Sequence, residues 1–175
     1  MNRICSAVLA FALSAAAMPV FAQPQSETLY RHKHWEVEIV AFEDGSYACL
    51  AEVDASTDSF TIWVYQDNSV KLQFYSTSWE FGEGQTADLQ VAIDRRAPWN
   101  LTGAELYKNS VLFVLPDSDQ GVDLLVEVAR GSRLYLRTAN GEPVMDYSLA
   151  GSQASMNALI ECSDALTSTP GNPFN

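Results

Sequence analysis

The stretch WEVEIVAFEDGSYACLAEV, from Trp35 to Val53, decides the fold that we predict for this chain. Its first half largely alternates apolar and polar residues, as a strand with one buried face does. The run EDG at 43–45 interrupts this alternation, and Asp-Gly is a frequent hairpin turn. A second apolar run from Tyr47 to Val53 follows the turn. These residues predict two antiparallel strands joined by a hairpin.

Short alternating runs continue after this hairpin, separated by polar turn residues. In the clearest of them, Val70, Leu72 and Phe74 share one face. The further predicted strands are 60–65, 70–75, 89–93, 112–115, 134–136 and 144–149. The pattern predicts an antiparallel, strand-rich sheet or a partly closed barrel.

Two segments in the last third have apolar residues at helical spacing instead. The first is 119–130, where Ser118 and its two aspartate neighbours are cap candidates and Gly131 is predicted as a left-handed C-cap. Its periodic apolar residues are Val122, Leu125, Val126 and Ala129. The second helix begins near Ser152, which we predict as its N-cap. Its apolar stripe is Ala154, Ala158, Leu159, Cys162 and Leu166.

The two helices and the strands predict one α+β domain over residues 35–166. Residues 23–34 are predicted as a polar lead-in, and 167–175 as a flexible tail with two prolines and a glycine. The first 22 residues have the parts of a secretory signal peptide: Arg3, an apolar run over 4–17, and a cleavage-like VFA at 20–22. This run is too short for a membrane span. We therefore expect a periplasmic or secreted bacterial protein that begins at Gln23.

Two cysteines remain after signal cleavage, because Cys5 lies in the signal peptide. Cys49 is in the second predicted strand, and Cys162 is on the apolar stripe of the last helix. In an oxidising compartment two cysteines most simply form one disulfide. The predicted bond would hold the last helix against the early part of the sheet.

The charge of the mature chain is strongly negative. Without Arg3 it has 9 basic and 22 acidic residues, a net charge of −13. This excess argues against nucleic acid and anionic membrane surfaces as partners, because both are bound through Lys and Arg. It favours solubility and a cationic partner. The sequence does not name that partner or an oligomeric state, and after cleavage we expect no integral membrane segment.

His32 and His34, the only histidines, could begin a Zn²⁺ or Cu²⁺ site, because residues i and i+2 of a strand point to one face. An exposed basic patch with Arg31 and Lys33 is the alternative. Glu80 and Glu83, beside two aromatic residues, could serve a hydrolase, although such pairs arise by chance in an acidic chain. We predict no cofactor and no catalytic residue.

A group of aromatic residues is a candidate binding patch. Trp63, Tyr65 and Tyr75 lie on the strand faces opposite to Ile62, Val64 and Phe74, and Trp79 follows closely. If the sheet is covered on one side only, these aromatic residues form an exposed recognition surface. If both faces are covered, they belong to the core. The sequence leaves both alternatives open.

The early Trp35, a cysteine in the second strand and the closing segment from Tyr147 to Cys162 together resemble the invasion-associated locus B family of small exported Gram-negative, alphaproteobacterial proteins. This resemblance implies an envelope or secreted role linked to host interaction, and no catalytic motif. We expect a non-enzymatic binding protein that engages an envelope or host macromolecule. The alternatives are a periplasmic hydrolase with a carboxylate site and a metal-binding periplasmic factor.

Overall fold

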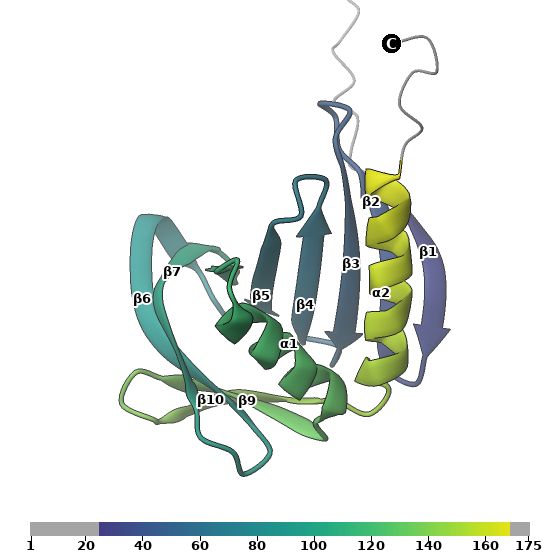
Figure 1. The fold of residues 1–175 in the computed structure, drawn as a ribbon. Coiled ribbons are helices and arrows are strands. Elements are labelled where there is room, and N and C mark those ends of the chain that lie inside the picture. Colours follow the sequence, from purple (N-terminus) through teal and green to yellow (C-terminus); the bar gives the residue numbers. More distant parts are fainter. Residues whose placement is uncertain (1–24, 169–175) are drawn as a thin grey trace, which may run out of the picture.

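A computed structural model describes residues 25–168, which form ten strands and two helices (Figure 1). The predicted signal peptide and residues 169–175 of the predicted tail lie outside the described residues. The elements are β1 (Gln25–His32), β2 (Trp35–Ala41), β3 (Tyr47–Asp54), β4 (Asp58–Tyr65), β5 (Val70–Ser76), β6 (Phe81–Ile93), β7 (Trp99–Lys108), β8 (Ser110–Leu115), α1 (Asp119–Arg130), β9 (Arg133–Thr138), β10 (Pro143–Ser148) and α2 (Ser152–Thr167).

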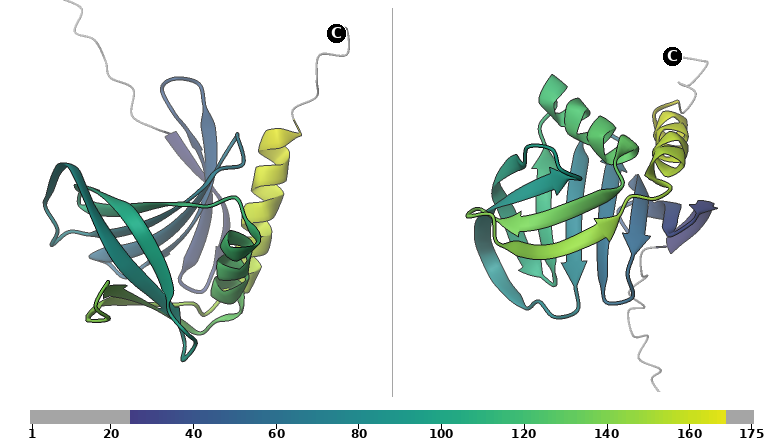
Figure 2. Two further views of the ribbon diagram at one scale, coloured as in Figure 1. Left: turned by 60° about the vertical axis from the view of Figure 1, so that its left-hand side comes forward. Right: turned by 90° about the horizontal axis from the view of Figure 1, so that it is seen from below.

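The ten strands form one sheet in the order β1-β2-β3-β4-β5-β8-β7-β6-β9-β10, and every neighbouring pair is antiparallel. The sheet is open, with β1 and β10 at its two edges. It is also curved: β6, β7, β9 and β10 bend out of the plane of β2–β5, and both helices lie on one side of it (Figure 2). This confirms the predicted α+β class.

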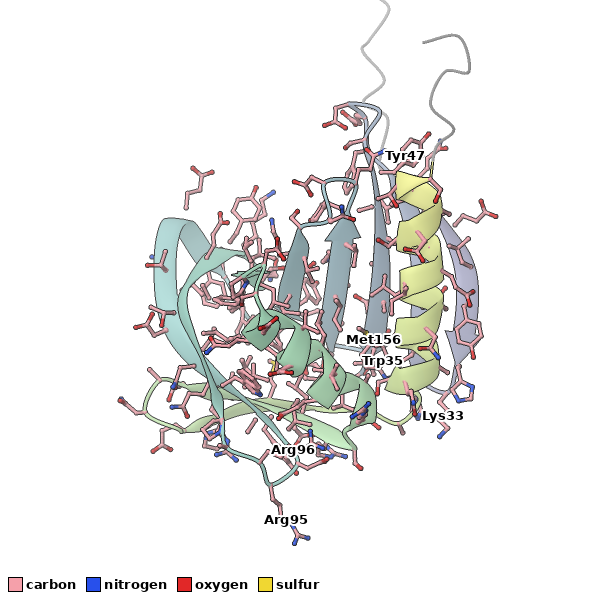
Figure 3. The ribbon with its side chains drawn as sticks, in the orientation of Figure 1. Lys33, Trp35, Tyr47, Arg95, Arg96 and Met156 are labelled. Atoms are coloured by element: carbon pink, nitrogen blue, oxygen red, sulfur yellow. A yellow bond between two sulfur atoms is a disulfide. The ribbon has the colours of Figure 1, made fainter. Side chains whose placement is uncertain are left out.

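The core lies between the inner face of the sheet and the two helices. Phe60 and Phe74 stack with ring centroids 5.1 Å apart, and both rings contact Tyr147 from β10. Trp35 packs edge-on against Phe60 at 6.2 Å. Aromatic pairs of this kind add to the free energy gained by burial. The strands predicted from alternating residues therefore supply the interior of the domain (Figure 3).

The predicted disulfide is confirmed. Cys49 of β3 and Cys162 of α2 are bonded, with Cα atoms 6.1 Å apart and a separation of 113 positions in sequence. Both cysteines are buried in the core. The bond fixes α2 on the inner face of the sheet, where the helix covers β2 and β3 (Figure 1).

The predicted polar lead-in contains a strand. Residues 25–32 form β1, which pairs with β2 from Gln25 opposite Ala41 to His32 opposite Trp35. All eight residues of β1 are exposed, so no apolar alternation marks it in the sequence. Its pairing depends on backbone hydrogen bonds to an edge that β2 leaves open, which side-chain patterns do not report.

The strands β6 and β7 extend well beyond what the sequence predicts. The alternation of Leu89, Val91 and Ile93 indicates only the end of β6, and β7 is not predicted at all. Register shifts interrupt the β6–β7 pairing at two places. Between Ala87 and Leu89, β7 has one residue more than β6, and a one-residue offset moves side chains to the other face, which erases a simple two-residue period.

Two of the predicted helix caps differ from the structure. Gly131 is the C-cap of α1, as predicted, but with φ −78° it is extended and not left-handed. Glycine is needed there because a Cβ would lie 2.4 Å from Cγ2 of Ile93. Ser152 is not the N-cap of α2, a position that Gly151 occupies with φ 104°. The buried Ser152 hydroxyl instead donates to the carbonyl oxygens of Val128 and Ala129, at 2.9 and 3.1 Å. It joins the start of α2 to the end of α1.

One of the predicted cap candidates of α1, Ser118, is confirmed as its N-cap. Its side chain accepts a hydrogen bond from the backbone N–H of Gly121.

Within residues 25–168, no helix has both the length and the apolar character that crossing a bilayer requires.

Candidate functional site: an aromatic groove on the outer face

The aromatic residues predicted as a patch lie on the face of the sheet away from the helices. Cys49 points to α2 and pairs with Val64, so Trp63 and Tyr65 point to the opposite, outer side. Trp63, Tyr65 and Tyr75 line one groove of about 390 Å³ there, together with Phe42 and Tyr107. We call this the outer groove. The helices cover the inner face, and the outer aromatic side chains stay partly accessible.

The rings in the outer groove form a continuous apolar surface. Trp63 and Tyr65 alternate on β4, with centroids 6.2 Å apart and planes inclined by only 16°. The Phe42 ring is tilted against Trp63, with centroids 6.4 Å apart. Side chains two residues apart on one strand stand side by side. The three rings therefore form one apolar surface that lines the groove.

A short chain of hydrogen bonds fixes the floor of the outer groove. The indole Nε1 of Trp63 donates to Oε1 of Gln73 at 2.8 Å. Nε2 of Gln73 then donates to the hydroxyl of Ser110 at 2.9 Å. These three residues come from β4, β5 and β8, which are adjacent in the sheet. The site is therefore held in place before any ligand arrives, which lowers the entropic cost of binding.

Two cationic side chains border the aromatic rings. Nζ of Lys71 lies 5.7 Å from the ring centroid of Tyr65, and Nζ of Lys108 lies 5.0 Å from that of Tyr107. In residues 25–168 neither ammonium group forms an ion pair with a carboxylate. Burial, with a smaller effect from the charge of Asp67, raises the pKa of the Tyr65 hydroxyl, which stays neutral at physiological pH.

Sequence reasoning found three of the residues that line the outer groove and missed others. Phe42, Tyr107, Lys71 and Lys108 were not predicted. Tyr107 and Lys108 reach the site only because β8 and then β7 follow β5 in the sheet, an order that is not visible in the sequence. Lys71 had a signal, because the alternation of Val70, Leu72 and Phe74 places it on the same face as Tyr75.

Trp79 does not line the outer groove with the other predicted patch residues. Its ring packs against Phe81, with centroids 5.5 Å apart, and against the core cluster. Only its backbone carbonyl approaches the site, where it accepts a hydrogen bond from the side chain of Asn109.

The two histidines lie at a hairpin. His32 ends β1 and pairs with Trp35, so Lys33 and His34 form the two-residue turn, and Lys33 has φ 56°. This turn ends the strand alternation on which the argument for a shared face depends. Within the described residues, no three His, Cys, Asp or Glu side chains group as a metal site requires.

The carboxylates considered for a hydrolase are Glu80 and Glu83, and both are exposed. They lack the apolar surroundings that a carboxylic general acid uses.

The carboxyl of Glu38 on β2 has a raised pKa, mainly through burial and further through the charges of Glu36 and Glu52. It faces outward opposite Leu50, on the sheet rather than in a cleft.

A second depression of about 420 Å³ lies on the other side of the molecule, between α1 and α2 and above β4 and β5. The periodic apolar residues Val122 and Val126 of α1 line it and are exposed. The buried side chains of α1 are instead Leu124 and Val128. Of the apolar stripe predicted for α1, Leu125 and Ala129 pack against the core, whereas Val122 and Val126 border the groove.

Comparisons with protein-family models, with curated proteins and with solved structures found no match to this chain.

Proposed function

We propose that this chain is an exported, non-enzymatic binding protein that engages an envelope or host macromolecule through its outer groove. The observation that carries the proposal is the grouping of five aromatic residues in one groove on the side of the sheet away from the helices. Aromatic side chains contribute large contact areas at a low cost in conformational entropy, and they are enriched at recognition surfaces.

Three observations support export to a periplasmic or extracellular location. The first 22 residues read as a signal peptide. A disulfide joins the remaining cysteines, and such bonds persist in oxidising compartments. The resemblance of the segment from Tyr147 to Cys162 to the invasion-associated locus B family implies the same role.

The experiment uses the mature chain, residues 23–175, with its disulfide formed. Its binding to a panel of soluble polysaccharides and to soluble host and envelope proteins is measured by calorimetry. Tyr107→Ala and Tyr65→Leu remove ring surface from the outer groove. Tyr30→Ala on β1 is a matched control, because Tyr30 and Tyr107 are similarly exposed, at 36% and 38%.

We expect at least one polymer of the panel to bind the wild-type chain, with an affinity that falls about tenfold in the outer-groove variants. A tenfold loss corresponds to about 1.4 kcal/mol, within the range for an aromatic contact. The Tyr30→Ala variant should bind like the wild type. Binding that the groove variants leave unchanged, or no binding to any member of the panel, would overturn the proposal.

A further inference from the structure

We propose that the ligand of the outer groove is an acidic polysaccharide, a chain of sugar rings that carry carboxylate groups. This inference rests on the proposed function and names the class of ligand for the same site. It depends on the charge of the groove, on the arrangement of its rings, and on the backbone pairing of the strands that form it.

The charge of the groove contrasts with that of the whole protein. The full chain has 22 acidic and 10 basic residues, only three of which are lysines. Two of the three, Lys71 and Lys108, line the outer groove, although 37 positions separate them in sequence. Neither pairs with a carboxylate in the part of the chain that the structure describes. Two unneutralised ammonium groups beside one groove complement an anionic ligand.

The rings and polar groups suit a sugar chain. The faces of aromatic rings carry negative potential, and they attract the C–H faces of a pyranose ring. Trp63 and Tyr65 stack on each other, and Tyr75 and Tyr107 line the same groove. Asn109 and Ser110 line the same groove, and the amide oxygen of Asn109 and the hydroxyl hydrogen of Ser110 are not used in the hydrogen bonds described above. Apolar stacking surfaces with a few convergent polar groups are what an oriented carbohydrate needs.

The backbone pairing argues for a sugar chain over an acidic peptide in extended form. Peptides in the β conformation bind by adding a strand to a free sheet edge. The groove lies on β4 and β5, each of which is paired with a strand on both sides. A peptide laid across this face would bury its own N–H and C=O groups without strand partners, at a cost for each group.

Acidic residues on the same outer face limit where the carboxylates of the ligand can lie. Glu52, Asp54 and Asp58 line a neighbouring depression that shares Trp63 and Tyr75 with the outer groove. Asp67 lies beside Tyr65 and accepts hydrogen bonds from the backbone and hydroxyl of Ser69. Asp67 also shares a depression with Lys71, and Glu105 of β7 lies opposite Leu112, which lines the groove. We therefore place the carboxylates of the ligand directly at the two ammonium groups, within the outer groove.

The test compares polymers that differ only in charge. Polygalacturonate is titrated into the mature, disulfide-bonded chain at low salt, and so is its fully methyl-esterified form, which has the same backbone without the negative charge. Alginate and hyaluronate are added as further acidic polymers. The protein variants are Lys71→Gln, Lys108→Gln and the double variant. Lys33→Gln is the matched control, because Lys33 is the third lysine and lies in the β1–β2 turn beside the start of α2 (Figure 3).

We expect at least one acidic polymer to bind. If polygalacturonate is the acidic polymer that binds, it should bind at least tenfold more tightly than its methyl ester. Each groove lysine variant should lose about fivefold in affinity, as for an exposed charge pair, and Lys33→Gln should lose nothing. Raising the salt to about 1 M should weaken binding, because the screening length falls to about 3 Å.

The inference is overturned if none of the acidic polymers binds, or if the lysine variants bind like the wild type. Groove-dependent binding of a neutral polysaccharide or of a protein alone would overturn it and leave the proposed function intact. Near-ultraviolet circular dichroism of each variant checks that the substitution has not altered the fold, so a loss of affinity can be assigned to the missing charge.

Discussion

Breaking the bond between Cys49 and Cys162 is expected to lower the free energy of unfolding by about 5 kcal/mol. The bond closes a loop between two residues that are 113 positions apart in sequence. In the chain-entropy description, a loop of this length restricts the unfolded chain by about 16 cal/mol/K, which is about 5 kcal/mol at 25 °C. Domains of this size are stable by only about 5–15 kcal/mol, so the loss is a large part of the total.

The assay is urea unfolding followed by tryptophan fluorescence, with and without a reductant. Trp35 is a suitable reporter, because it is only 1% exposed in the folded state. The double variant Cys49→Ala, Cys162→Ala provides a second route to the open loop. We expect it to lose at least as much as reduction does, because it also removes two buried sulfur atoms.

A difference below about 1 kcal/mol between the oxidised and reduced chains would refute this reasoning. It would mean that the unfolded chain gains little freedom when the loop opens, against the chain-entropy description. A loss close to 5 kcal/mol that the double variant reproduces would support it.

Three further substitutions, with a control for the first of them, test the packing and the charges of the fold. Gly131→Ala would place a methyl group 2.4 Å from Ile93 and should cost about 1–3 kcal/mol in urea unfolding; Gly82→Ala meets only ordinary contacts and should stay within about 0.5 kcal/mol. Ser152→Ala leaves two carbonyl oxygens of α1 without their donor and should cost about 1–3 kcal/mol, and a loss under 0.5 kcal/mol would contradict the role assigned to its hydroxyl. Burial raises the pKa of Glu38, so its ionisation opposes folding as the pH rises through that pKa. Glu38→Gln should therefore raise the thermal midpoint at pH 7, and this gain should shrink at pH 4; an equal gain at both pH values would count against the assignment.

The parts of the fold that could be predicted from the sequence are those in which the residue pattern of a single strand or helix shows which of its faces is buried or where it begins. Val70, Leu72 and Phe74 alternate because one face of β5 is buried. The cap at Ser118 depends on contacts within four residues. The disulfide followed from counting cysteines after signal cleavage. Each of these inferences uses local information or composition alone.

The remaining parts depend on contacts between distant segments. The insertion of β8 between β5 and β7 is not encoded in any local period. The same holds for Gly131, whose role comes from the approach of Ile93 and Leu149. In the outer groove, alternation identified Trp63 and Tyr75, whereas Tyr107 and Lys108 reach the site only through the order of the strands.

That order also has a consequence for a chain that emerges residue by residue. Strand β5 pairs with β4 along one side and with β8 along the other, but the hairpin of β6 and β7 lies between β5 and β8 in sequence. Until residues 110–115 have been synthesised, one side of 70–76 presents unsatisfied N–H and C=O groups. Such an edge invites pairing with other chains. The nascent chain thus exposes an unpaired strand edge before β8 is complete, and we expect a holdase chaperone to bind it at that stage.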